Sequence, residues 1–138
     1  MLIDAYGRTV NYLRISITDR CDLRCTYCIP KGFHEFEKPE HWLSFDEIER
    51  VVRQFALMGT RHFRLTGGEP LLRKGIVKLV ARLKRIEGVE DLSLSTNATQ
   101  LQHYAHDLRS AGLHRLNVSL YSLSQHSIEQ ITRFDAKA

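Results

Sequence analysis

The chain carries three cysteines, and all of them lie on one short segment, at Cys21, Cys25 and Cys28. Their spacing is C-x3-C-x2-C, which places three thiolates on a single loop. Three thiolates can hold three irons of a four-iron, four-sulfur cluster and leave the fourth iron open. An open iron can bind a molecule and pass it an electron, whereas a cluster held by four cysteines mainly transfers electrons. The cysteines therefore predict a [4Fe-4S] site with a reactive iron.

Two other interpretations of these cysteines remain open on spacing alone. One is a zinc site with His34 or His41 as the fourth ligand, although structural zinc sites usually pair two C-x2-C-like knuckles and only one is present. The other is a set of free thiols that bind no metal. Arg20 and Arg24 each precede a cysteine, where they favour thiolates and offset the negative charge of a cluster.

A second signal is the run Gly67-Gly68-Glu69-Pro70. Consecutive glycines expose backbone N–H and C=O groups and permit a ligand to approach the main chain closely. Glu69 could accept a hydrogen bond from a ligand ammonium group, and Pro70 fixes the turn into the next helix. The simpler interpretation is a tight turn between a strand and a helix, with a solvated glutamate.

Six further polar side chains are candidates for ligand contacts because they lie within strands or at strand ends. Arg14 and Arg64 lie within expected strands, where an inward guanidinium could clamp a phosphate in bidentate fashion. Exposure on an edge strand is the alternative for both. Hydroxyl or amide contacts to a sugar or base could come from Ser95, Thr96, Asn97 and Ser119, although a single serine or threonine at a strand end is usually a turn or cap residue.

The periodicity of the hydrophobic residues predicts the strands and helices that carry these motifs. Residues 12–18 alternate and include β-branched side chains, so they predict a strand. Ser44 and Glu47 form a capping box that opens a helix, which Gly59 ends. The other expected elements are strands at 62–66, 91–95 and 115–120, and helices over 76–86, near 104–111 and from about Ser124.

Strands that alternate with amphipathic helices imply an α/β fold with a parallel sheet and right-handed crossovers. Four such units do not close a barrel, which has about eight strands in its common form. The sheet is therefore either open or part of a larger barrel. The cysteines follow the first strand, Gly67-Gly68 follows the second, and Ser95 and Ser119 lie late in the third and fourth. These positions share the carboxyl edge of the sheet, where α/β folds bind ligands.

Composition fits a soluble globular domain: 43% of the 138 residues are hydrophobic and 26% are charged. No apolar run approaches the roughly 20 residues that a membrane span needs, and the N-terminus shows no secretory signal. Clustered cysteines suit metal binding in a reducing compartment, so we expect a cytoplasmic protein. The net charge of +4 fits an anionic substrate, but the basic residues are dispersed, which argues against a nucleic-acid groove.

Together these motifs resemble a known family. The cysteine spacing, with Tyr27 before the last cysteine and Gly-Gly-Glu-Pro later in the chain, resembles the radical S-adenosylmethionine (SAM) enzymes. Within them, residues 12–21, 64–70 and 116–120 resemble the GTP 3′,8-cyclases of molybdenum cofactor biosynthesis. That family is considerably longer, so the chain resembles its N-terminal half. The resemblance implies that residues 1–138 are a radical SAM core, the first four βα units of a partial (βα)6 TIM-like barrel.

The resemblance also implies a reaction and its partners. An electron from the cluster would split SAM into methionine and a 5′-deoxyadenosyl radical, which would abstract a hydrogen from the ribose of GTP and start its cyclisation. A reductant protein such as flavodoxin or ferredoxin would supply the electron, and the full-length family forms a homodimer. No catalytic side chain is implied. Cys21, Cys25 and Cys28 would hold the cluster, Tyr27, Gly68 and Ser119 would contact SAM, and Arg14, Arg64 and Ser95 would contact GTP.

The chain departs from the family pattern at several positions. Tyr121 stands where the family has Asp, Ala98 where it usually has Gly, and Ser95 where it usually has Thr. If position 98 needs a positive φ, alanine there costs about 1 kcal/mol. The C-terminal half of the family, with a second cysteine-held cluster and further basic residues for the substrate, has no counterpart in these residues.

Two alternatives to a GTP cyclase follow from the residues. One is a radical SAM enzyme with another substrate such as a peptide, which would not need Arg14 and Arg64. The other is a zinc-binding or remnant protein without activity. Residues 131–138 show no Gly or Pro stop, so the chain is expected to end in mid-fold. The isolated chain is then expected to fold poorly and not to turn over.

Overall fold

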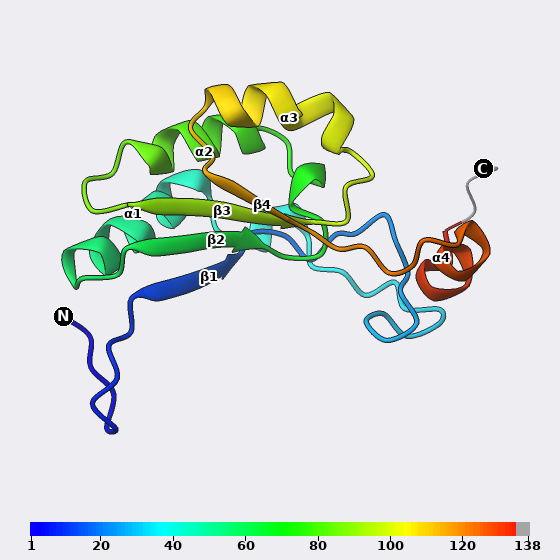
Figure 1. The fold of residues 1–138 in the computed structure, drawn as a ribbon, viewed down its shortest axis with the longest axis horizontal. Coiled ribbons are helices and arrows are strands. Elements are labelled where there is room, and N and C mark those ends of the chain that lie inside the picture. The colour runs from blue at the N-terminus through cyan, green and yellow to red at the C-terminus, as the bar shows by residue number, and fades with distance from the viewer. Residues whose placement is uncertain (135–138) are drawn as a thin grey trace.

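The computed structural model describes residues 1–134 and shows a parallel sheet of four strands (Figure 1). Strands and helices alternate along the chain, as the sequence pattern predicts. Short 3-10 helices at Pro39–His41 and Pro70–Leu72 are not predicted by that pattern. In chain order the main elements are β1 (Tyr12–Ser16), α1 (Phe45–Leu57), β2 (His62–Thr66), α2 (Ile76–Lys84), β3 (Asp91–Thr96), α3 (Leu101–Ser110), β4 (Arg115–Val118) and α4 (Gln125–Thr132).

The strands lie in the order β1-β2-β3-β4, and each is parallel to its neighbour. Helices α1, α2 and α3 cover one face of the sheet (Figure 1), and residues of all three belong to one buried hydrophobic cluster. A sheet wound in one direction, with its helices on one face, has the geometry of a barrel wall. A doubly wound sheet instead carries helices on both faces. The structure therefore favours the partial barrel over the open sheet.

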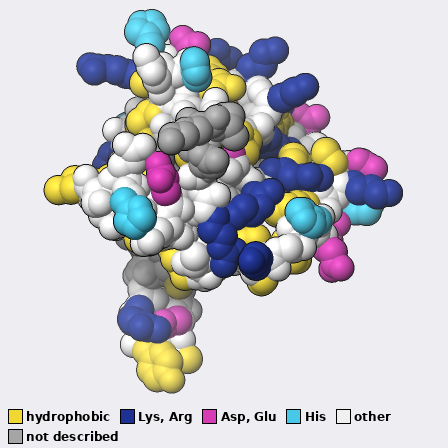
Figure 2. Space-filling model, turned by 90° about the vertical axis from the view of Figure 1, so that its right-hand side faces the viewer, with side chains coloured by type: hydrophobic (Ala, Val, Ile, Leu, Met, Phe, Trp, Pro, Cys, Tyr) yellow, Lys and Arg dark blue, Asp and Glu magenta, His cyan; other side chains and the backbone are white. Residues whose placement is uncertain are grey.

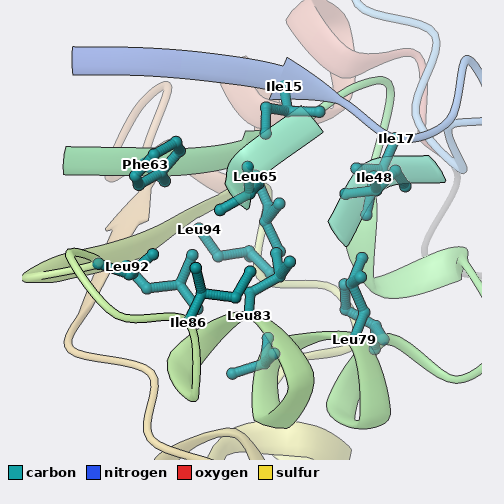
Figure 3. Packing of buried hydrophobic residues seen from close by; sticks show 14 of the residues in the cluster. Ile15, Ile17, Ile48, Phe63, Leu65, Leu79, Leu83, Ile86, Leu92 and Leu94 are labelled. Carbon is teal, nitrogen blue, oxygen red and sulfur yellow. The ribbon is translucent and has the colours of Figure 1, made fainter. Parts of the chain in front are cut away.

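The core forms between this sheet face and the helices. Successive strand residues point to opposite faces, so every second residue of β2 and β3 is buried. Figure 3 shows these side chains packed against the apolar side of α2. The labelled members of this cluster include Phe63, Leu65, Leu92, Leu94, Leu79, Leu83 and Ile86.

The alternate residues of the strands form a polar row on the opposite face. Arg14 pairs in register with Arg64, Arg64 with Ser93, and Ser93 with Arg115. Closer to the carboxyl edge, Ser95 pairs with Asn117. None of the helices within residues 1–134 packs on this face. In a barrel it becomes the interior, so the sequence gathers its hydrophilic strand residues where a substrate would lie.

The local helix signals are confirmed. The Ser44 N–H donates to Glu47 Oε2 at 2.7 Å, and the Glu47 N–H donates to Ser44 Oγ at 3.2 Å, which completes the capping box of α1. Ser124 caps α4. The first strand is shorter than predicted because it ends at Ser16, and α3 begins earlier than predicted, at Leu101.

The sequence predicts that the chain ends in mid-fold and that it contains no membrane span. The expected end in mid-fold rests on residues up to 138, of which 135–138 lie outside the described residues. Within the described part of the chain, no helix combines the length and the apolar character that a membrane crossing requires.

Candidate functional site

The three cysteines line one cavity of about 500 Å³ at the carboxyl edge of the sheet. Cys25 is buried, Cys21 is partly buried and Cys28 is exposed. Neither His34 nor His41 lines this cavity. Among residues 1–134, no set of three or more His, Cys, Asp and Glu side chains is gathered tightly enough to hold a single metal ion. An iron–sulfur cluster takes one thiolate on each iron, so three thiolates spread around one cavity fit it.

The segment that leads into the cysteine loop is bound to the turn after β2. The Gly68 N–H donates to the Thr18 carbonyl at 2.8 Å, and the Glu69 N–H donates to the Arg20 carbonyl at 2.7 Å. A Cβ atom on Gly67 would lie 2.2 Å from the Thr18 carbonyl oxygen, and one on Gly68 would lie 2.2 Å from that of Arg20. The paired glycines therefore allow two stretches of the chain's own backbone to touch. We call this contact the glycine clasp.

Glu69 is buried, with 1% of its surface exposed, and its carboxylate is held by the protein. It accepts hydrogen bonds from the Leu71 N–H at 3.0 Å, the Thr96 hydroxyl at 2.8 Å and the Asn97 N–H at 2.7 Å. The simpler interpretation, a turn with a solvated glutamate, is therefore wrong about the solvation of Glu69. Glu69 joins the turn after β2 to the end of β3, and these bonds offset the cost of burying its charge.

The end of β3 is in turn joined to the cysteine loop. Asn97 Nδ2 donates to Asp22 Oδ1 at 2.8 Å and lies 3.9 Å from Cys21 Sγ. The Thr99 hydroxyl donates to the other carboxylate oxygen of Asp22. Asp22 and Thr99 are site residues that sequence reasoning missed, because only the folded sheet brings them together across more than seventy positions of the chain.

Helix α4 also binds the cysteine loop through backbone hydrogen bonds. The Arg24 N–H donates to the Thr132 carbonyl and the Thr26 N–H to the Ile131 carbonyl, both at 2.9 Å. Figure 1 shows α4 beside the loops at the carboxyl ends of the strands, far from α1–α3. The backbone of the cysteine loop is thus held by the glycine clasp and by α4.

The predicted ligand-contacting residues fall into two groups. Tyr27, Gly68 and Ser119 all line the cavity with the cysteines, and so do Arg14 and Ser95. Arg64 does not line it, since its Nε lies 3.3 Å from Ser93 Oγ and its guanidinium group stacks on the Tyr12 ring at 5.4 Å. Arg64 nevertheless lies beside Arg14 in the register of the sheet.

Tyr121, the residue that departs from the family pattern, also lines this cavity. Its ring centroid lies 5.9 Å from that of Tyr27, with the two planes tilted by 50°. Burial raises the pKa of the Tyr121 hydroxyl far above its ordinary value, so the phenol is neutral at physiological pH. Burial also raises the pKa of the Cys21 thiol, with the nearby carboxylates of Asp22 and Glu69 adding to the effect.

Comparison with solved structures supports the fold. Two structures of BtrN, one in complex with AdoMet and 2-DOIA and one in an open conformation, match with TM-scores of 0.63 and 0.62. The matches cover 90% and 91% of this chain and 51% and 56% of BtrN, at 15% and 16% sequence identity.

Curated relatives match along nearly the whole chain. A GTP 3′,8-cyclase of Geobacter sulfurreducens is 50% identical over 134 residues, one of Heliobacterium modesticaldum is 46% identical over 132 residues, and GTP 3′,8-cyclase 2 of Pseudomonas aeruginosa is 47% identical over 134 residues. These matches cover 96–97% of this chain. The chain spans about 40% of the length of these relatives.

The Radical SAM superfamily model matches residues 15–137, which include all three cysteines, the glycine clasp and the polar ends of β3 and β4. This match covers most of the chain and agrees with the one-sided helices of the sheet and with the thiolates at its carboxyl edge. The chain therefore belongs to the radical SAM superfamily, whose enzymes use a [4Fe-4S] cluster and S-adenosylmethionine.

Proposed function

We propose that residues 1–138 form the radical SAM core of a GTP 3′,8-cyclase that acts in molybdenum cofactor biosynthesis. The observation that carries this proposal is the identity of 46–50% with relatives of that name over almost the whole chain. The activity belongs to proteins of which this chain spans about 40%, so the proposal concerns the longer protein that contains this core.

The cavity supports the cofactor half of the proposal. Cys21, Cys25 and Cys28 would hold the cluster, which when bound supplies the electron that splits SAM. Tyr27, Gly68 and Ser119 would contact SAM. Asp19 also lines the cavity, and its buried Oδ1 has no hydrogen-bond partner within residues 1–134. An acceptor without a donor suits the ammonium group of SAM.

The polar face of the sheet supports the substrate half. Arg14 and Arg64 lie side by side on neighbouring strands, and the half-buried Ser95 lies near the carboxyl end of the next strand. Two guanidinium groups in one row can together bind several oxygens of a triphosphate, because each donates in a planar fork. In this arrangement the phosphates of GTP lie over the sheet and its ribose lies toward the cysteines.

The surface around the cysteine loop supports an acidic electron donor such as flavodoxin or ferredoxin. Figure 2 shows Lys and Arg side chains grouped on the face that carries this loop and α4. Arg20, Lys31 and Arg133 are exposed there, and Arg133 donates to the Ile29 carbonyl at 3.1 Å. A basic surface next to an exposed cysteine would draw an acidic reductant to the cluster.

We further propose a cytoplasmic location and a homodimeric full-length protein, as the resemblance implies.

A hybrid enzyme tests the proposed substrate. The corresponding N-terminal region of the Geobacter sulfurreducens relative is replaced by this chain, and the purified hybrid is reconstituted anaerobically with iron and sulfide. It then receives a reductant, SAM and GTP that carries deuterium at ribose C3′. We expect deuterium in the 5′-deoxyadenosine product, and we expect none from a Cys28→Ser hybrid.

The outcomes separate the alternatives. A cluster-loaded hybrid that cleaves SAM but never transfers deuterium from GTP would reject GTP and favour another substrate, such as a peptide. A folded hybrid that binds zinc and no iron would reject the radical SAM chemistry altogether.

Arg14→Ala and Arg64→Ala should each weaken GTP binding about tenfold or more, because each removes a charged hydrogen-bond donor. Arg53→Ala, on the exposed side of α1, is the matched control.

A further inference from the structure

The side chain of Asn97 connects the end of β3 to the first cysteine. Its Oδ1 accepts from the Thr99 N–H at 3.0 Å and lies 3.0 Å from the Thr99 hydroxyl oxygen, whose hydrogen is donated to Asp22. Its Nδ2 lies 2.8 Å from Asp22 Oδ1 and 3.9 Å from Cys21 Sγ. The side chain therefore has protein partners at both ends of its amide.

These partners determine the orientation of the Asn97 amide. A backbone N–H can only donate, so the end of the amide that meets Thr99 must be the oxygen. The NH2 group then faces the cysteine loop with two hydrogens. The Asp22 carboxylate takes one of them, which leaves the other for the sulfur of Cys21.

The main chain of Asn97 is held as firmly as its side chain. Its backbone N–H donates to Glu69 Oε2 at 2.7 Å, and Glu69 is buried. A donor fixed in this way on the end of a strand keeps its position when the loop moves, because its support lies in the core of the sheet.

We propose that Asn97 is a positioning residue that donates an N–H group to the sulfur of Cys21 and raises the reduction potential of the cluster this cysteine holds. The reduced cluster carries more negative charge than the oxidised cluster, so a hydrogen bond to its sulfur ligand stabilises the reduced form. The proposal depends on the cluster and not on the identity of the substrate, so it stands or falls separately from the GTP cyclase assignment.

Asn97 also raises the reduction potential of the cluster in a second way, through its contact with Asp22. The Asp22 carboxylate lies 4.0 Å from Cys21 Sγ, where its negative charge disfavours the reduced cluster. Asn97 and Thr99 donate to both of its oxygens and so reduce the charge that Cys21 meets. Loss of the Asn97 amide removes a donor from Cys21 and uncovers the charge of Asp22.

The first test measures the midpoint potential of the reconstituted chain by redox titration followed by EPR. Asn97→Ala should lower the potential, and Asn97→Asp, which adds a negative charge without a donor, should lower it further. Thr99→Val is the matched control. It removes the hydroxyl that donates to Asp22 but keeps the backbone N–H that orients Asn97, so its potential should fall by much less than that of Asn97→Ala. An unchanged potential in Asn97→Ala, or an equal fall in Thr99→Val, would overturn the proposal.

The second test needs no cluster, so a variant that fails to load iron cannot obscure the answer. The side-chain NH2 resonances of Asn97 are recorded by 15N NMR in the metal-free chain. Cys21→Ala should shift them, because it removes the sulfur acceptor, and Cys28→Ala should leave them in place. Resonances that do not respond to Cys21→Ala would contradict the N–H contact itself.

Discussion

At the scale of single residues, Ala98 departs from the family pattern at a position where the backbone favours glycine. Its φ is 67°, in the left-handed region, at the turn between β3 and α3. A Cβ atom costs about 1–2 kcal/mol in this conformation, and glycine adopts it freely. This chain has alanine where the family usually has glycine, and the positive φ at this position is the condition on which the expected cost depends.

Ala98→Gly should therefore stabilise the fold. The relief of backbone strain exceeds the extra entropy that glycine gives the unfolded chain, so we expect a net gain of about 0.5–1 kcal/mol. Ala105→Gly, at an exposed position within α3, is the matched control and should cost about 1 kcal/mol. Urea unfolding of both variants measures the difference. A loss of stability in both would show that strain at position 98 is negligible.

The spacing of the cysteines predicts correctly that they lie together, whereas the roles assigned to the ligand-contacting residues stay predictions. The spacing of Cys21, Cys25 and Cys28 gathers them on one cavity because they share a loop. The roles of Asn97 and Glu69 could not be predicted from their types. Each depends on how the end of β3 meets the turn after β2, which is a property of the register between strands.

At the scale of elements, the glycine clasp explains why two glycines stand together after β2. The sequence predicts close approach of a ligand to this turn, and the structure shows close approach of the chain's own backbone. Gly68→Ala should displace the Arg20 carbonyl and cost about 1–3 kcal/mol, as overpacking does. Hydrogen exchange of the Glu69 amide should also accelerate.

Gly32→Ala gives the control for this prediction. Gly32 has a positive φ but nothing within 4 Å of an added Cβ, so the substitution introduces strain of about 1 kcal/mol without a collision. The Glu69 amide should keep its protection in this variant. Equal effects of the two substitutions on that amide would show that the clasp does not hold the loop.

The pairing of β3 with β4 includes an ion pair whose strength depends on pH. Arg115 Nε lies 3.0 Å from Asp91 Oδ1, and the guanidinium group holds the pKa of Asp91 below its ordinary value of 3.8. A depressed pKa stabilises the fold fully above 3.8, and this contribution is lost as pH falls through the lower pKa of the folded state. Asp91→Asn should flatten the loss of stability below pH 4. Unfolding curves at pH 7, 4 and 3 measure it, and an identical slope in the variant would contradict the assignment.

The order and type of the elements could be predicted from periodicity, and their ends could not. The strand predicted to reach Thr18 ends at Ser16, because its register partner Thr66 is the last residue of β2, and the Thr18 carbonyl accepts from the Gly68 N–H of the turn that follows. The start of α3 at Leu101 is not marked in the sequence, because Gln100 before it makes no capping hydrogen bond with its side chain.

At the scale of the whole molecule, β4 forms one edge of the described sheet, and each of its residues is exposed. Leu116, Val118 and Leu120 expose 37%, 50% and 68% of their surfaces along this edge. An exposed strand with apolar side chains is a template for pairing. The 138-residue chain should therefore associate as its concentration rises.

Val118→Lys should reduce that association, because a lysine on an edge strand opposes pairing with a second chain. Sedimentation velocity over a range of concentrations measures it. Val10→Lys, in the exposed segment before β1, is the control for association through other surfaces. If Val10→Lys has the larger effect, the contact lies at the N-terminal segment and not at β4.

Hydrogen bonds from the turn after β2, from β3 and from α4 give the cysteine loop its shape before any iron arrives. Most of the entropy cost of ordering a metal site is then met when the sheet folds rather than when the cofactor binds. Such a loop is preorganised for the cluster rather than ordered by it. Cluster insertion would follow folding as a separate step, and a chelator that strips the iron would leave an empty loop ready to be filled again.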